Sequence, residues 1–120
     1  MLTMGVDIGS TTSKAAILED GQRIIAKSIV PVGTGTRGPG EVLHSVLSLA
    51  GLQQQDIART VATGYGRLHF NTADRQVSEV SCHGKGVHFL VPGARTVVDI
   101  GGQDAKAILL DENGMLSNFM

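Results

Sequence analysis

Short apolar segments separated by turn residues open the chain. Residues 2–8 and 13–18 have the length and the apolar content of buried strands, with a turn of small polar residues between them. Residues 23–32 alternate loosely between apolar and polar positions and are rich in isoleucine and valine. Asp20-Gly21, a dipeptide typical of tight hairpin turns, stands between the second and third segments. This pattern predicts three antiparallel strands at the start of the fold.

The apolar spacing becomes helical after the third strand. A helix is expected to begin at residue 39 or 40 and to end before Gly51, because glycine commonly terminates helices. Apolar residues recur at helical spacing again over residues 77–91, and residues 60–63 and 96–100 are typical of short buried strands. Strands alternating with helices indicate an α/β fold, in which the antiparallel strands continue into parallel ones to give a mixed sheet.

An internal repeat is the most informative feature of the sequence. The residues Val-Asp-Ile-Gly at 6–9 return at 98–101, a constant offset of 92 (98 − 6). Across residues 6–18 and their counterparts, seven of 13 positions are identical, whereas average composition gives roughly one match by chance. Each copy also ends in a turn, at Asp20-Gly21 and at Asn113-Gly114. We infer that the same strand-turn-strand hairpin occurs twice.

Each hairpin carries an aspartate and a lysine at the same spacing. The aspartate ends a buried strand, a glycine-containing turn follows, and the lysine comes seven residues after the aspartate, as Asp7 with Lys14 and Asp99 with Lys106. Amides and hydroxyls of such a turn can bind a phosphate, and an aspartate can hold Mg²⁺ through water. The alternative is that each aspartate only stabilises its turn. Because the whole pattern is repeated, we favour two turns that grip a nucleoside triphosphate.

Composition excludes several other classes of protein. The chain has 120 residues, 42% hydrophobic and 18% charged, with a net charge of −1, which is typical of a folded domain. No stretch approaches the roughly 20 apolar residues that span a bilayer and no signal-peptide pattern opens the chain, so we expect a cytoplasmic protein without a membrane partner. Without a run of lysine or arginine, we expect no nucleic-acid partner. Cys82 is the single cysteine, which excludes an internal disulfide.

Both hairpins resemble the phosphate motifs of a known ATPase superfamily. Val-Asp-Ile-Gly-Ser-Thr-Thr-Ser-Lys at 6–14 and Val-Asp-Ile-Gly-Gly-Gln-Asp-Ala-Lys at 98–106 are similar to the first and second phosphate motifs of actin, sugar kinases and seventy-kilodalton heat-shock chaperones. Ala-Thr-Gly-Tyr-Gly-Arg at 62–67 and Glu-Val-Ser-Cys-His-Gly-Lys-Gly at 79–86 narrow the resemblance. The whole chain resembles the activator ATPases of 2-hydroxyacyl-CoA dehydratases such as 2-hydroxyglutaryl-CoA dehydratase, of the BadF/BadG/BcrA/BcrD type, and their relatives in benzoyl-CoA reductase.

The resemblance implies a particular fold and domain organisation. Residues 1–92 would form a ribonuclease H-like α/β domain with a mixed sheet, as in actin-like ATPases. Residues 93–120 would form the first hairpin of a second, similar domain. We expect this hairpin to expose strand edges and the side chains of Ile108, Leu110 and Phe119, and the chain therefore to self-associate.

The resemblance also implies a role for each residue of the two hairpins. Asp7 and Asp99 would position Mg²⁺ through water, and with Gln103 they would occupy the catalytic positions. The remaining residues would bind the phosphates of ATP: Gly9, Ser10, Thr11, Thr12 and Lys14 from the first hairpin, and Gly101, Gly102 and Lys106 from the second. Such groups suit phosphoryl transfer, which needs positioning and charge neutralisation more than covalent chemistry.

An ATP-driven electron donor is the activity that the resemblance implies. Members of that family are homodimers that hold one [4Fe–4S] cluster between their subunits. They use ATP hydrolysis to move a low-potential electron, received from reduced ferredoxin or flavodoxin, into a partner acyl-CoA dehydratase or reductase. The cluster cysteines of these activators follow the second hairpin and are absent from this sequence. We therefore expect the N-terminal portion of such an activator, with little or no ATPase activity alone.

Two other functions remain open. One is the N-terminal part of a small-molecule kinase of the same superfamily, such as an N-acetylhexosamine kinase, in which an acceptor hydroxyl replaces water. The other is a non-catalytic nucleotide-binding module that contacts a partner protein. Residues 33–38 also match the glycine pattern of dinucleotide-binding loops. The preceding strand is the third of a meander, so we expect an active-site or interface loop there, and a core thiol at Cys82.

Overall fold

The chain folds into two units, Met1–Val77 and Ser78–Met120, and each unit has its own sheet. The structure is a computed structural model that describes residues 1–35, 37–101 and 105–120. The helix over residues 79–90 belongs by its contacts to the second unit, although it precedes the domain boundary expected between residues 92 and 93. That boundary stays a prediction, and the two units are described separately below.

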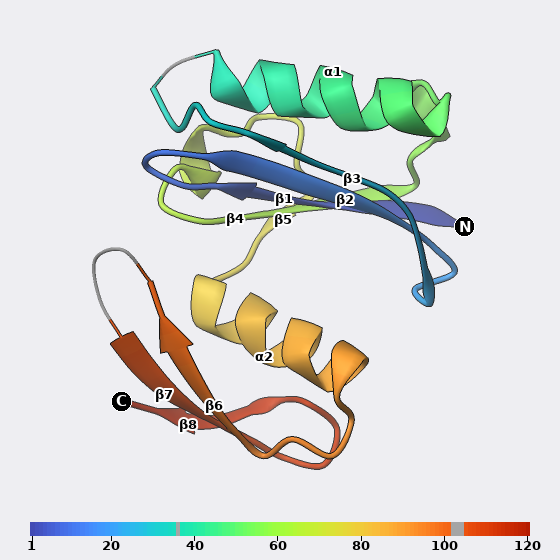
Figure 1. Ribbon diagram of the computed structural model, residues 1–120. Coiled ribbons are helices and arrows are strands. Elements are labelled where there is room, and N and C mark those ends of the chain that lie inside the picture. The colour runs from blue at the N-terminus through green and yellow to red at the C-terminus, as the bar shows by residue number, and fades with distance from the viewer. Residues whose placement is uncertain (36, 102–104) are drawn as a thin grey trace. The chain divides into compact units, whose positions relative to one another are not determined.

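A five-stranded mixed sheet forms the first unit, with the strand order β3-β2-β1-β4-β5 (Figure 1). Its strands are β1 (Leu2–Ile8), β2 (Ser13–Glu19), β3 (Arg23–Val30), β4 (Arg59–Thr63) and β5 (Arg75–Gln76). The first three strands pair antiparallel, and β4 and β5 continue the sheet in parallel. The expected antiparallel start and parallel continuation are confirmed. The edge strand β5 was not predicted, because two residues carry no periodic pattern.

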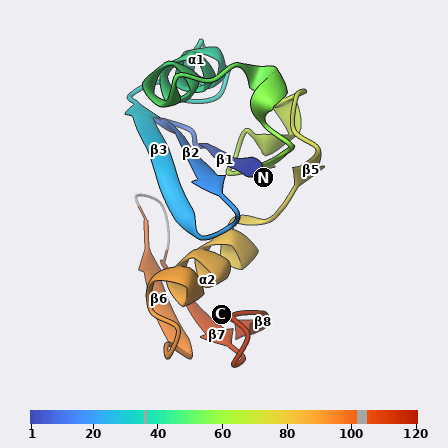
Figure 2. The same cartoon turned by 90° about the vertical axis from the view of Figure 1, so that its right-hand side faces the viewer.

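Helix α1 (Gly38–Ala50) lies along one face of this sheet (Figures 1 and 2). It ends as predicted at Gly51, which takes a φ of 69° and donates its amide to the last turn of the helix. Two short 3-10 turns follow the helix, η1 (Gln54–Asp56) before β4 and η2 (Arg67–His69) between β4 and β5. Val42 and Val46 of α1 are fully buried against the sheet, so α1 closes the core of the first unit.

Strand alternation decides which side chains enter that core. Alternate residues of β1 and β2 face α1, and the buried cluster consists of Met4, Val6, Ile8, Ala15, Ile17, Val42, Val46, Ala62 and Phe70. Because successive strand residues point to opposite faces, burial of Val6 and Ile8 puts Asp7 on the face away from α1. The hydrophobic pattern therefore also orients the first candidate site residue.

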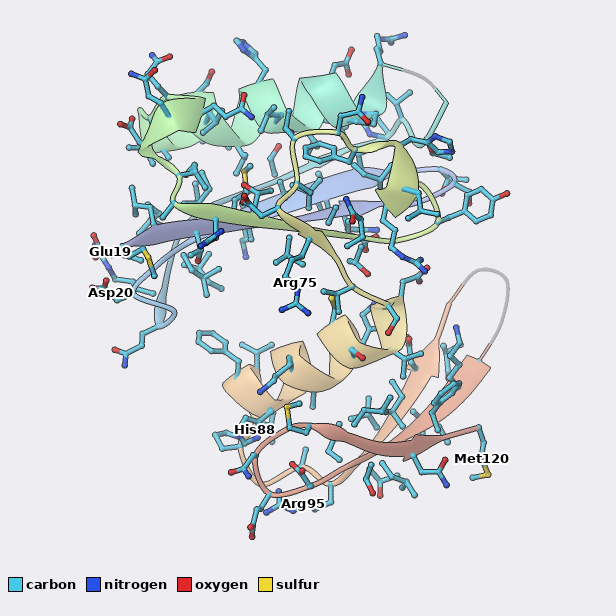
Figure 3. The ribbon with its side chains drawn as sticks, turned by 180° about the vertical axis from the view of Figure 1, so that it is seen from behind. Glu19, Asp20, Arg75, His88, Arg95 and Met120 are labelled. Atoms are coloured by element: carbon cyan, nitrogen blue, oxygen red, sulfur yellow. The ribbon has the colours of Figure 1, made fainter. Side chains whose placement is uncertain are left out.

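The turn between β2 and β3 has the conformation that its sequence predicts. Asp20 and Gly21 both take positive φ values, 55° and 67°, as the two central residues of a type I′ turn do, and the amide of Gln22 closes the turn on the carbonyl of Glu19. Glu19 and Asp20 lie at this turn (Figure 3), and Oδ1 of Asp20 accepts a hydrogen bond of 2.6 Å from the amino group of Met1. That bond lowers the pKa of the Asp20 carboxyl. The predicted hairpin is confirmed.

A three-stranded antiparallel sheet and one helix form the second unit. The elements are α2 (Glu79–Leu90), β6 (Thr96–Ile100), β7 (Ala105–Leu110) and β8 (Leu116–Phe119), with the strand order β6-β7-β8. Ser78 begins α2, because its hydroxyl accepts a hydrogen bond from the amide of Ser81. The third strand was not predicted. With it, the internal repeat covers a whole meander, since β1, β2 and β3 correspond to β6, β7 and β8.

The expected exposure of Ile108 and Leu110 is wrong. Their side chains are 0% and 5% exposed, and they form a small core with Val80 of α2. Helix α2, which precedes the hairpin in the chain, covers this face of the sheet (Figure 2). Phe119 is 51% exposed, in agreement with the expectation.

The opposite face of the second sheet carries the exposed apolar side chains. Val98, Ile100 and Leu109 are 68%, 78% and 36% exposed. At the offset of the repeat they correspond to Val6, Ile8 and Ile17, which α1 covers in the first unit. In the part of the chain that the structure describes, the second unit has no helix equivalent to α1. This apolar face replaces the one first expected as the cause of self-association.

Self-association through this face is expected to depend on Val98. Replacing Val98 with lysine puts a charge on the apolar face. In light scattering, we expect the apparent mass of the Val98→Lys chain to rise less with protein concentration than that of the unsubstituted 120-residue chain. Leu49 of α1 is 66% exposed, so Leu49→Lys is a control of equal exposure outside the face. A clean monomer at high concentration for the unsubstituted chain would contradict the prediction.

Candidate phosphate-binding hairpins

The first hairpin brings Asp7 and Lys14 together. These residues are register partners on β1 and β2, and Nζ of Lys14 lies 3.7 Å from Oδ2 of Asp7. Their side chains are 30% exposed for Asp7 and 46% for Lys14. An ion pair this accessible to water contributes at most about 1 kcal/mol to stability. Both groups can therefore exchange their mutual contact for a ligand at little cost.

A closed turn connects the two strands of this hairpin. The amide of Gly9 donates a hydrogen bond of 2.9 Å to the carbonyl of Thr12. Gly9 therefore closes the turn with its amide, and the phosphate contact expected for Gly9 stays a prediction. Ser10 and Thr11 are exposed and Thr12 is half-buried, so their hydroxyls lie at or near the surface. Ser13 is fully buried, and its hydroxyl donates to the carbonyl of Val32 at 2.8 Å.

Two glycine-containing segments pack tightly against this turn. The amide of Thr34 donates to the carbonyl of Gly9 at 2.9 Å, and a Cβ on Gly33 would lie 2.3 Å from the carbonyl oxygen of Ser10. On the β4 side, a Cβ on Gly64 would lie 2.3 Å from Oδ1 of Asp7. Glycine is required where backbone approaches so closely. Residues 33 and 34 thus support the hairpin, in keeping with the expected active-site loop, while Thr36 lies outside the described residues.

Thr63 is a candidate site residue that sequence reasoning missed. It is the register partner of Asp7 across the parallel pair of β1 and β4. Its hydroxyl is buried and has no hydrogen-bond partner among the described residues. Buried hydroxyls nearly always have a partner, so this oxygen fits a ligand or an ordered water beside Asp7. The available signal was its position at the end of a strand, directly before Gly64-Tyr65-Gly66.

The turn after β4 contains Tyr65 and Arg67, which belong to the 62–67 segment of the family resemblance. Tyr65 is 77% exposed, whereas Nη1 of Arg67 donates a hydrogen bond of 3.1 Å to the carbonyl of Gly64. Arg67 therefore stabilises the turn that approaches Asp7.

The second hairpin repeats the Asp–Lys pairing with a different neighbour. Asp99 on β6 and Lys106 on β7 are register partners. Oδ2 of Asp99 lies 2.5 Å from Nδ1 of His83 on α2, a contact that no sequence pattern indicated. Gly101 is exposed. Gly102 and Gln103 lie outside the described residues, so their expected phosphate and catalytic roles stay predictions.

Close packing fixes α2 on the second sheet. Gly84 is buried, and a Cβ there would lie 2.7 Å from a methyl carbon of Leu110. Gly114, with a φ of 77°, packs under the ring of His88, which lies on α2 (Figure 3). Cys82 is half-buried, which is more accessible than the expected core thiol.

The donor groups of these hairpins suit Mg²⁺. Within the described residues there is no group of three or more His, Cys, Asp or Glu side chains that could hold a metal ion. Mg²⁺ needs only one or two carboxylates, because it keeps several waters and binds phosphate oxygens. Asp7, with the orphaned hydroxyl of Thr63 beside it, fits such a hydrated ion. The described helices also include none that is long and apolar enough to cross a membrane.

Comparison with protein families agrees with this geometry. The model of the BadF/BadG/BcrA/BcrD ATPase family matches residues 4–120. The chain belongs to this family. Membership confirms the family resemblance of the two phosphate motifs, which both lie within the matched range.

Several known proteins are similar to this chain over nearly its whole length. It is 56% identical over 119 residues to the activator of lactoyl-CoA dehydratase from Anaerotignum propionicum, covering 99% of this chain and 46% of that protein. The solved activator of the 2-hydroxyisocaproyl-CoA dehydratase from Clostridium difficile with bound ADPNP is 52% identical, with a TM-score of 0.93. Component A of the (R)-2-hydroxyglutaryl-CoA dehydratase from Acidaminococcus fermentans is 51% identical, with a TM-score of 0.94.

These two solved structures also confirm the fold class. The match to the Clostridium difficile activator covers 100% of this chain and 45% of that protein. The match to the Acidaminococcus fermentans component covers 99% of this chain and 46% of that protein. It therefore has the α/β fold of the actin-like ATPases and spans about half the length of the relatives it matches.

Proposed function

We propose that this chain is the N-terminal part of an ATP-dependent activator of an acyl-CoA dehydratase or reductase. The observation that carries the proposal is the match over the whole chain to a dehydratase activator solved with ADPNP, at 52% identity. The accessible Asp7–Lys14 pair beside a turn of hydroxyl residues supports it, because these groups suit a Mg²⁺-bound triphosphate.

In this proposal both hairpins contact Mg–ATP. Asp7 would hold the hydrated Mg²⁺, Asp99 would help to hold it or would order the attacking water, and Gln103 would line the γ-phosphate side. The phosphates are bound by the other expected residues: Gly9, Ser10, Thr11, Thr12, Lys14, Gly101, Gly102 and Lys106. The ion supplies neutralisation of the charge that develops on the phosphate oxygens. Thr63 adds a hydroxyl beside Asp7, and in addition to its proposed phosphate contact Gly9 closes the turn on which Ser10 and Thr11 stand.

The iron–sulfur cluster does not fit the residues of this chain. Cys82 is the single cysteine of the sequence, and a [4Fe–4S] cluster needs several thiolates. The [4Fe–4S] cluster, electron transfer from reduced ferredoxin or flavodoxin, the homodimer and the cytoplasmic location remain proposals for the whole protein.

The test compares the whole protein with the 120-residue chain. Prepared without oxygen, the whole protein is expected to hydrolyse ATP with Mg²⁺, to contain iron and sulfide, and to activate a 2-hydroxyacyl-CoA dehydratase or a benzoyl-CoA reductase. Phosphorylation of an N-acetylhexosamine without activation of either enzyme would show the kinase alternative instead, and nucleotide binding without hydrolysis would show the non-catalytic module.

The 120-residue chain alone is expected to have little or no ATPase activity. It spans 45% of the length of the ADPNP-bound relative, so most of that protein's residues are not available to complete a nucleotide site. Phosphate release with Mg–ATP measures this, and the whole protein at the same concentration is the positive control. Substantial Mg²⁺-dependent hydrolysis by the 120-residue chain would contradict the prediction.

A further inference from the structure

His83 makes the one side-chain hydrogen bond that Asp99 has among the described residues. Nδ1 of His83 lies 2.5 Å from Oδ2 of Asp99, and the side chains are 38% and 28% exposed. An ionised carboxylate has acceptors only, so the ring must donate from Nδ1. The proton on Nδ1 thereby fixes the tautomer of the neutral ring, with Nε2 as its acceptor.

The position of His83 is set by packing on both sides of it along α2. Gly84 is buried, and only the absence of a Cβ lets the helix come so close to Leu110. Val80, one turn before, is buried with Ile108 and Leu110. The imidazole therefore reaches Asp99 from a helix that is fixed on β7, which is a more exact placement than a loop would give.

The two copies of the hairpin differ in how the aspartate is held. Asp7 has Lys14 as an ion-pair partner at 3.7 Å, within its own hairpin. Asp99 has a short directional hydrogen bond to a residue outside its hairpin. A charge-assisted hydrogen bond fixes the orientation of a carboxylate, whereas an exposed lysine acts mainly as a point charge. Both copies therefore contain the aspartate and the lysine, but the side chain that contacts the aspartate differs between them.

We propose that His83 is a positioning residue for Asp99. Its Nδ1–H holds Oδ2, which leaves Oδ1 of Asp99 for the hydrated ion or the attacking water. This inference rests on the function proposed above. Without the bond, the carboxylate rotates among several orientations, which lowers the rate of the chemical step and leaves the phosphate contacts of the first hairpin intact. Loss of His83 therefore reduces kcat and leaves KM for ATP nearly constant.

Three variants of the whole protein test the positioning role. His83→Leu is expected to lower kcat by roughly 10-fold to 100-fold, the usual effect of removing an outer-shell partner, with KM for ATP within about twofold. His83→Asn places an amide nitrogen near the position of Nδ1 and is expected to restore most of kcat. His69→Asn, an exposed histidine of η2 in the first unit, is the control. Equal losses in His83→Leu and His83→Asn, or an unchanged kcat in His83→Leu, would overturn the proposal.

A spectroscopic readout separates this inference from the proposed function. Long-range ¹H–¹⁵N spectra of histidine-labelled whole protein, recorded at about pH 8, report which nitrogen carries the proton. His83 is expected to be protonated at Nδ1, and Asp99→Ala is expected to shift the proton to Nε2. Protonation of His83 at Nε2 alone in the unsubstituted protein overturns the contact. If His83 is protonated at Nδ1 but the whole protein does not hydrolyse ATP, the proposed function and the catalytic role of His83 are wrong. The hydrogen bond between His83 and Asp99 is then still confirmed.

Discussion

Replacing Gly64 with alanine is expected to destabilise the first unit by roughly 3 kcal/mol, the combined cost of a left-handed backbone and of overpacking. Gly64 has a φ of 93°, which L-residues rarely adopt. An added Cβ would lie 2.3 Å from Oδ1 of Asp7 and 2.5 Å from the carbonyl oxygen of Ile8. The carbonyl belongs to β1 and cannot move alone, so β1 and β4 must separate at the end where Asp7 lies.

Urea unfolding of the 120-residue chain measures this effect. Gly40 is the matched control, because an added Cβ there meets no atom within 4 Å. Gly40→Ala is expected to leave stability unchanged or to raise it by up to about 1 kcal/mol through helix propensity. A Gly64→Ala midpoint equal to that of Gly40→Ala would show that the end of β4 adapts easily, against the prediction.

Local sequence signals were sufficient for most elements of the first unit. The Asp20-Gly21 turn, the helix end at Gly51 and the strand alternation of β1 and β2 each depend on residues close together in the chain. Such signals report backbone preference and burial directly. The spacing of Asp7 and Lys14 was also read from the sequence, and the structure adds that the two residues are register partners.

Contacts between distant segments could not be predicted in this way. The hydrogen bond between His83 and Asp99 joins a helix and a strand across 16 positions of the chain. The internal repeat covers Asp99 but does not extend to His83, so it gave no indication of this contact. Thr63 lies beside Asp7 only because β4 pairs with β1 in parallel across an intervening helix. The exposure of Ile108 was misjudged for the same reason, since burial depends on α2. The alternation of side chains along one strand depends on neighbouring residues. Which helix packs on a face of the sheet depends on residues far away in the chain.

The internal repeat shows which parts of the hairpin are constant and which are adapted. Both copies keep an aspartate and a lysine as register partners and both add a third strand. The covering helix differs, because α1 packs on the face of Val6 and Ile8, whereas α2 packs on the face of Ile108 and Leu110. In the second unit the helix therefore lies on the same face as Asp99, which is what allows His83 to reach it. In the first unit Asp7 lies on the face away from α1 and has no helical partner of this kind among the described residues.

The Asp7→Asn variant of the whole protein is expected to lower ATP hydrolysis by roughly 10²-fold to 10³-fold, comparable to the loss of a main electrostatic group in other active sites. Asparagine keeps the shape of the side chain and removes the charge proposed to hold the hydrated Mg²⁺. Stability is expected to change by less than about 1 kcal/mol, because the partner Lys14 is half-exposed. A retained unfolding temperature with lost hydrolysis therefore separates a binding role of Asp7 from a structural one.

Phosphate release at saturating Mg–ATP, together with thermal unfolding, measures both expectations for Asp7→Asn. Asp20→Asn is the matched control, since Asp20 lies at the opposite end of the same hairpin, is exposed, and among the described residues its side chain binds only the amino group of Met1. It removes the same charge and is expected to leave hydrolysis unchanged. Hydrolysis by Asp7→Asn within about fivefold of the original rate would be too small a loss for a group that positions the metal, and it would assign Asp7 to the turn alone. An equal loss in both variants would instead point to the net charge of the hairpin, because the two substitutions share nothing else.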